Sequence, residues 1–425
     1  MGQYKHIHFI GIGGIGMSGL ARFFVHEKKQ VSGSDRATSP ITDALKTLGV
    51  TFYENQVASN ITDGIDFIVY TEAMSEDQEE MVAARNLGVP MMNYFQALGL
   101  VANQYYLVAV SGTHGKTTTT AMIIDILEEA ELDPTAIVGS LRSKTGSNFR
   151  PGKSKYAVVE ACEYRRDFLS LTPDVLVITN IEAEHLDYYD DLKDVQKAFR
   201  ELAEQVRENG TVVANTADSK VKQALEGLEK KVINYGKYLD PRLKLNVPGL
   251  HNQMNAAAAT AAAECIGVTR EVSQKALENF AGTWRRFEYK GKVNGARVYD
   301  DYGHHPTEIT VTLKGAREMF PDKNILLIYQ PHLDSRTERL FLDFVTSISK
   351  ADRIILAPTY VARNVEAHGV SSEDLAEAIQ KVHPNIEYIN TFKDIVRQVK
   401  NNVTKNDLVL VMGAGDIAKV ANMLV

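Results

Sequence analysis

Residues 111–120 read Ser-Gly-Thr-His-Gly-Lys-Thr-Thr-Thr-Thr, and this stretch decides how the chain folds. An apolar run, 107–110, precedes it, and a segment of helical character, 121–130, follows it. In a strand–loop–helix unit of this kind, backbone N–H groups and the N-terminus of the helix bind phosphate. The stretch therefore predicts a phosphate-binding loop between a strand and a helix.

Two side chains of this loop have the chemistry that a nucleotide needs. We expect Lys116 to contact the β- and γ-phosphates and the hydroxyl of Thr117 to bind Mg²⁺. The glycine that usually stands five residues before the Gly-Lys pair is replaced by Val110, so the loop is a short variant. A glycine turn that only caps a helix is the alternative. Glycines, lysine and threonine in register behind a strand favour the phosphate site.

The composition is that of a globular protein with several hydrophobic cores. At 425 residues, the chain suggests about three domains. Its net charge of −7 argues against a nucleic-acid or membrane-surface partner, because either would favour a basic face. Two cysteines without metal-type spacing, no secretory signal and no run of roughly 20 apolar residues predict a cytoplasmic protein.

Short apolar runs alternate with helical segments and divide the chain into three blocks. This alternation indicates an α/β fold with mainly parallel sheets. We expect domains at residues 1–104, 105–282 and 283–425. The strands expected in the second block are 156–160, 175–179 and 211–214, and those in the third are 296–299, 324–328, 353–356 and 407–411.

A glycine-rich turn follows the first expected strand, 7–10. Gly11, Gly13 and Gly16 have the Gly-x-Gly-x-x-Gly spacing, and Asp35 ends the second expected strand. Together these features are typical of a turn that binds the diphosphate of a dinucleotide. NAD would be the usual ligand, but the same turn fits any diphosphate, and the sequence offers no separate hydride-accepting site.

Polar side chains follow two expected strands of the second block. Glu160 ends one strand, and Asn180 and His185 follow the next. Ligands of open α/β sheets bind at the carboxyl ends of the strands, so Glu160 and His185 could both serve Mg²⁺. Mg²⁺ usually prefers oxygen ligands. The alternative is that Glu160 caps a helix and His185 is an ordinary loop residue, and the sequence does not favour either interpretation.

Asparagines and arginines near the end of the second block have two interpretations each. Asn252 and Asn255 stand at the start of an alanine-rich helix, where they could cap the helix or contact an adenine edge. Arg285 and Arg286 could bind phosphate or be a solvated pair.

Two polar loops are expected in the third block. Residues 300–308 crowd acids, imidazoles and a glycine into one loop after a strand, which favours a functional site. Residues 330–337 again follow a strand, and Arg336 there could bind a carboxylate.

With these motifs in this order, the chain resembles the Mur ligase family over nearly its whole length. The resemblance rests on the order of segments 11–19, 112–120, 160–168, 251–255, 285–287, 300–309 and 330–337. It implies a Rossmann-like UDP-binding domain, a central P-loop ATPase-type domain with a mainly parallel sheet, and a Rossmann-like C-terminal domain. Segment 235–247 is shorter than in relatives, so we expect a trimmed central domain.

The resemblance also implies a role for each site residue. ATP would be held by the phosphate loop: Gly112, Thr113, His114, Gly115, Lys116, Thr117 and Thr118. Mg²⁺ would be bound by Thr117, Glu160 and His185. The other nucleotide contacts would be Asn180, Asn252 and Asn255 at the adenine, Asp301 at the ribose and Arg286 at the phosphates.

The substrates would bind the outer blocks. The UDP-sugar would occupy the first glycine-rich turn, at Gly13, Gly14, Gly16, Met17, Ser18 and Asp35. The incoming amino acid would contact Tyr302, His304 and Arg336, and His304 would accept its ammonium proton. Catalysis would depend on Lys116, Glu160, His185 and His304.

The activity implied is ATP-dependent addition of L-alanine to the carboxylate of UDP-N-acetylmuramate, by a monomer or weak homodimer. Leu333 and Asp334 replace an arginine and a tyrosine usual in the family, which leaves the amino acid open. A recycling ligase that joins a tripeptide to the same sugar nucleotide is therefore the nearest alternative. A catalytically inactive nucleotide-binding regulator is a third, and the retained Lys116, Glu160 and His185 argue against it.

Overall fold

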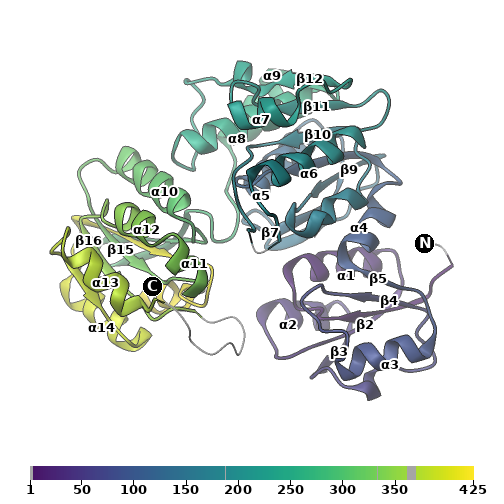
Figure 1. Ribbon diagram of the computed structural model, residues 1–425, viewed down its shortest axis with the longest axis horizontal. Helices are drawn as coiled ribbons and strands as arrows, with labels where there is room; N and C mark the ends of the chain where they lie inside the picture. Colours follow the sequence, from purple (N-terminus) through teal and green to yellow (C-terminus); the bar gives the residue numbers. More distant parts are fainter. Residues whose placement is uncertain (1–2, 187, 333, 361–369) are drawn as a thin grey trace. The chain divides into compact units, whose positions relative to one another are not determined.

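The structure, a computed structural model, describes residues 3–186, 188–332, 334–360 and 370–425. The chain divides into two compact units, each described by itself below. Unit 1 comprises Met1–Lys244 and Gln253–Ala281, and unit 2 comprises Leu245–Asn252 and Gly282–Val425. Unit 1 contains two sheets and unit 2 contains one (Figure 1).

The first sheet of unit 1 is parallel, with strand order β3-β2-β1-β4-β5. Side chains of β1 alternate between two cores: Phe9 packs towards α1, and Ile10 packs with residues of α3. Burial on both faces explains why the strands are short apolar runs. The elements are β1 (His6–Ile10), α1 (Ile15–His26), β2 (Gln30–Asp35), α2 (Pro40–Thr47), β3 (Thr51–Glu54), β4 (Phe67–Tyr70), α3 (Glu79–Leu87), β5 (Met91–Asn93) and α4 (Tyr94–Ala102).

The second sheet of unit 1 has the order β12-β11-β10-β6-β9-β7-β8, and only β7 and β8 pair antiparallel. The central strand β6 leads into the phosphate loop. The strands are β6 (Tyr106–Ser111), β7 (Thr135–Arg142), β8 (Ser147–Arg150), β9 (Tyr156–Glu160), β10 (Val175–Ile178), β11 (Thr211–Ala214) and β12 (Lys231–Asn234). The helices are α5 (Lys116–Glu129), the 3₁₀ segment η2 (Tyr164–Ser170), α6 (Leu192–Glu204), α7 (Ser219–Ala224), α8 (Leu250–Glu264) and α9 (Arg270–Glu278).

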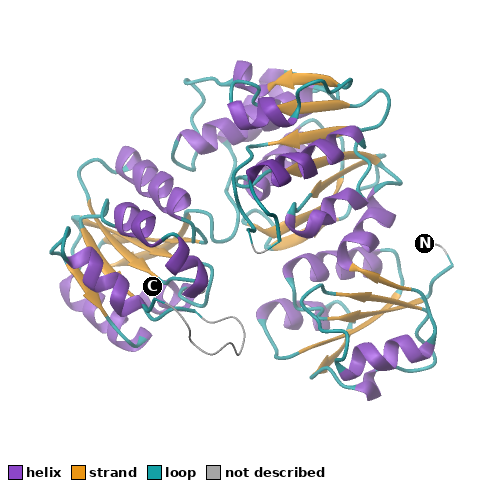
Figure 2. Ribbon diagram, in the orientation of Figure 1, coloured by secondary structure: helices purple, strands orange, loops and turns teal. Residues whose placement is uncertain are grey.

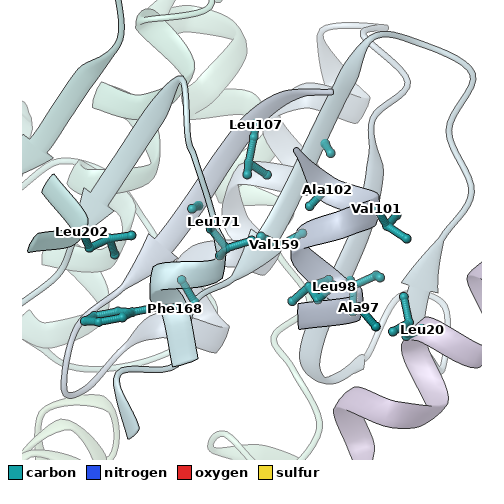
Figure 3. Close-up of a cluster of buried hydrophobic side chains, with 14 of the residues drawn as sticks. Leu20, Ala97, Leu98, Val101, Ala102, Leu107, Val159, Phe168, Leu171 and Leu202 are labelled. Atoms are coloured by element: carbon teal, nitrogen blue, oxygen red, sulfur yellow. The ribbon is translucent and has the colours of Figure 1, made fainter. Parts of the chain in front are cut away.

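One continuous hydrophobic core joins the two sheets of unit 1. Figure 3 shows Leu20 of α1 and Leu98 of α4 beside Val159 of β9 and Phe168 of η2. Gly19 lets α1 approach β7, since a Cβ there would lie 3.0 Å from the side chain of Ile137. Shared burial of this apolar surface explains why the first two sheets form one compact unit.

The sheet of unit 2 has the order β13-β14-β18-β15-β16-β17, and only β13 and β14 pair antiparallel. Helices cover both faces (Figure 2): Leu327 of β15 packs with residues of α10, α12 and α13, and Leu326 packs with residues of α14 and α15. The strands are β13 (Glu288–Val293), β14 (Ala296–Asp301), β15 (Asn324–Tyr329), β16 (Arg353–Leu356), β17 (Ile386–Tyr388) and β18 (Asp407–Met412). The helices are α10 (Pro306–Met319), α11 (Asp334–Arg339), α12 (Phe341–Ile348), α13 (Ser372–Gln380), α14 (Phe392–Asn402) and α15 (Ala418–Leu424).

The predicted α/β class with mainly parallel sheets is confirmed. Strands β9, β11 and β16 have the predicted bounds to the residue. The loop expected at 300–308 is wrong at its start, because Asp300 and Asp301 belong to β14 and pair with Val411 and Met412 of β18. The backbone of β18 pairs with these two positions and so extends β14 to include both aspartates. The predicted domain bounds, 1–104, 105–282 and 283–425, each enclose one sheet and stay a proposal.

Candidate active site

The phosphate loop connects β6 to α5 and is shaped by two glycines. Gly112 has φ 135° and Gly115 has φ 83°, both in a region that residues with side chains avoid. A Cβ at Gly112 would lie 2.0 Å from Oγ1 of Thr179, so no larger residue fits there. Gly115 is the N-cap residue of α5, which places the first N–H groups of the helix at the loop.

Asn180, just after β10, ties this loop down. Its Nδ2 donates to the carbonyl of His114, and its Oδ1 accepts from the N–H of His114, each across 2.9 Å. The N–H of Thr113 donates to the carbonyl of Asn180 across 3.1 Å. These bonds hold the loop in shape before a ligand binds. The bonds to His114 use one N–H and one lone pair of the amide, and the adenine contact of Asn180 stays a prediction.

Lys116, the first residue of α5, turns back across the loop. Its Nζ donates to the carbonyls of Gly112 and Thr113 and to both carboxylate oxygens of Glu163, the latter at 3.1 and 2.9 Å. Burial opposes the charge of the ammonium group, but Glu163, Cys162 and Glu160 together outweigh burial and raise the pKa of Lys116. Burial also opposes the charge of Glu163, yet Lys116 and His185 lower the pKa of Glu163 to about 2. The predicted phosphate-binding cation is thus half of a buried ion pair.

Glu160 ends β9 beside the start of α5. Its Oε1 accepts from the hydroxyl of Thr117 across 3.1 Å, and its Oε2 accepts from the N–H of Gly139 across 2.9 Å. A Cβ at Gly139 would lie 2.5 Å from Oε2, so the glycine lets β7 pass this close to the carboxylate. Adjacent hydroxyl and carboxylate oxygens are ligands that Mg²⁺ prefers. The structure therefore brings together the two oxygen ligands predicted for the metal.

His185 lies on the Glu163 side of the loop. Its Nε2 is 3.5 Å from Oε1 of Glu163. Over the residues that the structure describes, no three His, Cys, Asp or Glu side chains form a group that could hold a metal. Mg²⁺ commonly takes one or two carboxylates and completes its shell with water and phosphate oxygens. Thr117 and Glu160 fit that pattern, and the metal role of His185 stays a prediction.

The glycine-rich turn of the first sheet joins β1 to α1. The N–H of Gly13 donates to Oδ2 of Asp35 across 2.8 Å, and Gly14 is the N-cap residue of α1. The hydroxyl of Ser18 accepts from Nδ2 of Asn148 across 2.9 Å and is buried within unit 1. A glycine turn that leads into the N-terminus of a helix is an arrangement at which phosphate groups bind, and the diphosphate contact of this turn stays a prediction. The Ser18 hydroxyl donates to the carbonyl of Ile15 across 2.9 Å, so donation to a diphosphate oxygen would require that bond to break.

Tyr94, the first residue of α4, lies beside this turn. A Cβ at Gly16 would lie 2.9 Å from the Tyr94 hydroxyl, and the next residue, Met17, is buried. Burial and then the charge of Glu160 raise the pKa of Tyr94. The phenol is thus next to the predicted UDP site and within electrostatic reach of Glu160. An aromatic residue at the start of a helix has no distinctive sequence pattern, so Tyr94 was not predicted.

The two asparagines of α8 differ in their surroundings. In unit 1, Oδ1 of Asn255 would lie 2.4 Å from a Cβ at Gly115, so its amide faces the phosphate loop. In unit 2, Nδ2 of Asn252 donates to the carbonyl of Pro248 across 2.7 Å. The position of Asn255 beside the loop suits a nucleotide contact, while Asn252 stabilises the start of the helix.

In unit 2, Asp301 organises the segment after β14. Its Oδ2 accepts from the N–H of Phe287 and its Oδ1 from the N–H of Gly303, each across 2.7 Å. Burial raises the pKa of Asp301, and Arg286 opposes that shift. The carboxylate therefore shapes two loops that carry predicted nucleotide and amino-acid contacts, and its ribose contact stays a prediction.

Arg285 and Arg286 have different environments. Arg285 is buried, pairs with Oδ2 of Asp300 across 3.1 Å and donates to the carbonyls of Gly413 and Gly415. The side chain of Arg286 is 33% exposed, and its ion pair with Glu308 is long, at 3.8 Å. Arg286 is thus the more accessible member of the pair, and its phosphate contact stays a prediction.

The predicted amino-acid contacts surround His304. Nδ1 of His304 lies 3.1 Å from the carbonyl of Tyr302, and the ring of His304 is 5.8 Å from that of His332. A carbonyl only accepts, so Nδ1 carries the proton and the lone pair of the neutral ring falls on Nε2. That tautomer suits acceptance of an ammonium proton. Arg336 belongs to α11, but its side chain lies outside the described residues, as does Leu333.

Glu163 is the other site residue that sequence reasoning missed. It stands three residues after Glu160 in the 160–168 motif, where a second acid has no obvious metal role. Only its pairing with Lys116, 47 residues away, reveals it.

Among the helices that the structure describes, none has both the length and the apolar character needed to cross a bilayer.

Three family models match successive parts of the chain. They are the Mur ligase family catalytic domain over residues 6–106, the Mur ligase middle domain over 110–242, and the Mur ligase glutamate ligase domain over 285–415. The chain therefore belongs to the Mur ligase family, as its motifs predict. It is similar to the UDP-N-acetylmuramate–L-alanine ligase of Agathobacter rectalis, at 40% identity over 447 residues that cover 99% of this chain and 97% of that protein.

Solved structures agree with this placement. The UDP-N-acetylmuramate–alanine ligase of Thermotoga maritima matches with a TM-score of 0.85 and 28% identity, covering 99% of this chain and 98% of that one. A murein peptide ligase of Psychrobacter arcticus matches with a TM-score of 0.72 and 25% identity, covering the same shares of the two chains.

Proposed function

We propose that the protein is an ATP-dependent ligase that adds L-alanine to the carboxylate of UDP-N-acetylmuramate during peptidoglycan precursor synthesis. The observation that carries this proposal is 40% identity, over nearly the full length of both chains, to ligases of that name. The phosphate loop, with its lysine and its threonine–carboxylate pair, supplies the chemistry that such a ligase requires.

The reaction has two steps. The carboxylate of the sugar attacks the γ-phosphate of ATP, which gives an acyl phosphate and releases ADP. The amino group of alanine then attacks the activated carbonyl, and inorganic phosphate leaves. Two anionic reactants must meet in the first step, so positive charge at the γ-phosphate lowers the barrier.

The residues of unit 1 suit the first step. Lys116 would exchange part of its bonding to Glu163 for the β- and γ-phosphates, while N–H groups at the start of α5 would bind the remaining oxygens. When bound by Thr117, Glu160 and His185, Mg²⁺ would offset charge between carboxylate and phosphate. Tyr94 would line the path from the glycine-rich turn, where UDP would bind, to Glu160.

The residues of unit 2 would add nucleotide contacts and serve the second step. Arg286 would bind the phosphates of ATP and Asp301 its ribose. Tyr302 and Arg336 would hold the alanine, and Nε2 of His304 would accept the proton that its ammonium group loses before attack.

The main alternative is a muropeptide-recycling ligase that joins a tripeptide to the same sugar nucleotide. The similarity to a murein peptide ligase and the Leu333-Asp334 departure favour it. The 40% identity to alanine ligases favours alanine. A monomer or weak homodimer in the cytoplasm, with no nucleic-acid or membrane partner, completes the proposal.

The test is phosphate release from ATP with Mg²⁺ and UDP-N-acetylmuramate, measured with L-alanine, glycine, L-serine or the tripeptide. We expect L-alanine to give the largest stimulation. Stimulation by the tripeptide alone would identify the recycling ligase. If none of these amines stimulates phosphate release, the ligase proposal fails and an inactive regulator becomes the better description.

A further inference from the structure

Glu163 is a buried carboxylate that contacts both Lys116 and His185 beside the phosphate loop. It is 2% exposed, and its carboxylate lies 2.9 Å from Nζ of Lys116 and 3.5 Å from Nε2 of His185. The hydroxyl of Tyr189 donates to its backbone carbonyl. One carboxylate therefore connects the phosphate-binding lysine with the histidine predicted to bind the metal.

The bonding of Lys116 shows what Glu163 contributes. An ammonium group has three N–H donors. Two of them reach the carbonyls of Gly112 and Thr113, which belong to the loop itself, and the third reaches Glu163. Glu163 is thus the contact from outside the loop that fixes the direction of Nζ. An incoming phosphate takes one of the three N–H groups, and Glu163 is the anionic acceptor that competes with it for Nζ.

The backbone around Glu163 is held in an unusual conformation. Arg165 and Arg166 have φ values of 53° and 60°, a region that costs about 1–3 kcal/mol per residue unless the surroundings enforce it. Arg166 pairs with Asp194 across 2.6 Å, and Phe168 is buried in the shared core (Figure 3). Residues in such conformations persist only where the surrounding structure enforces them, and they cluster at functional sites.

We propose that Glu163 is a positioning residue for phosphoryl transfer. It orients Lys116 and His185, and it gives up part of its hydrogen bonding to Lys116 when the phosphate binds. The inference rests on the proposed ligase function. Loss of Glu163 impairs the rate of the reaction while nucleotide affinity is kept or improved, because the carboxylate that competes for Lys116 is gone.

The test compares Glu163→Gln with the wild type in two measurements. Titration calorimetry with ADP needs neither sugar nor amine, and we expect the ADP Kd to stay within threefold or to tighten. The kcat for phosphate release is measured with whichever amine stimulates most, and we expect a fall of about ten- to hundredfold, the usual effect of losing a supporting carboxylate. A kcat reduced less than fivefold, or an ADP Kd weakened more than threefold, would overturn the proposal.

Glu128→Gln is the matched control. Glu128 also has its pKa lowered to about 2, by Arg142, Lys144 and Arg150 acting against burial, but it lies away from the loop. It should lose stability without a change in kcat or ADP affinity. If Glu163→Gln does not fold, Glu163→Asp is used instead. It keeps the negative charge but moves the carboxylate away from Lys116, and the same two thresholds apply. Because the amine is chosen by its activity, failure of alanine as substrate leaves the test of Glu163 intact.

Discussion

The hydroxyl of Thr117 donates a hydrogen bond to Oε1 of Glu160 across 3.1 Å. Two segments 43 residues apart in the sequence thereby place a hydroxyl and a carboxylate together at the carboxyl edge of the second sheet. The other oxygen of Glu160 is held by the N–H of Gly139, so the carboxylate is oriented before a metal arrives.

Glu160→Gln tests the metal role of this pair. The amide oxygen can still accept from Gly139, so the fold should persist, but the anionic ligand is lost. We expect kcat to fall by at least about 100-fold, the upper range for losing a group that only supports a metal ligand. ADP binding without Mg²⁺ should be retained. An unchanged dependence of phosphate release on Mg²⁺ concentration would contradict the assignment.

Lys116→Ala should abolish turnover and also destabilise the protein. Its removal leaves the carboxylate of Glu163 buried without its partner, which costs about 3 kcal/mol of unfolding free energy. The double variant Lys116→Ala with Glu163→Gln should recover at least half of that loss in urea unfolding, yet remain inactive. UDP-N-acetylmuramate binding should be largely unaffected in both. Loss of sugar-nucleotide binding would show that the two sites are not separate.

The adjacent arginines of unit 2 should respond differently to alanine. Arg285→Ala removes the partner of buried Asp300 and two bonds to backbone carbonyls, so we expect a loss of about 3 kcal/mol in unfolding free energy. Arg286→Ala should cost less than about 1 kcal/mol, since its ion pair is long and partly solvated. Arg286→Ala should instead raise the KM for ATP. Equal effects on KM would disprove the distinction.

Asp167 should make stability depend on pH. Burial and the charge of Glu72, opposed by Arg165, raise its pKa to about 7, and among the described residues its buried Oδ2 has no hydrogen-bond partner. A raised carboxyl pKa means that the contribution of this group to stability falls as pH rises from about 4 to about 7. Asp167→Asn removes the buried charge. The free energy of unfolding of the variant, relative to that of the wild type, should therefore rise between pH 5 and pH 8 by up to about 1 kcal/mol in urea unfolding. A constant difference would refute this explanation.

Local patterns were enough for much of the fold. The bounds of β9 and β16 follow from short apolar runs, because strands buried on both faces leave this signature in any context. The phosphate loop could also be predicted from the sequence, since the positive φ values at Gly112 and Gly115 restrict those positions to glycine. Asp300 and Asp301 were predicted to lie in a loop, because their strand depends on pairing with β18, more than 100 residues later.

By itself, the sequence determined the α/β class, the phosphate loop, the family and the proposed reaction, because each depends on short segments in a set order. The tertiary structure alone decided which side chains meet. It paired Lys116 with Glu163, oriented Glu160 through Gly139, and separated buried Arg285 from accessible Arg286. The physical reason is that hydrogen bonds and ion pairs act over about 3 Å in space, whatever distance separates their partners along the chain.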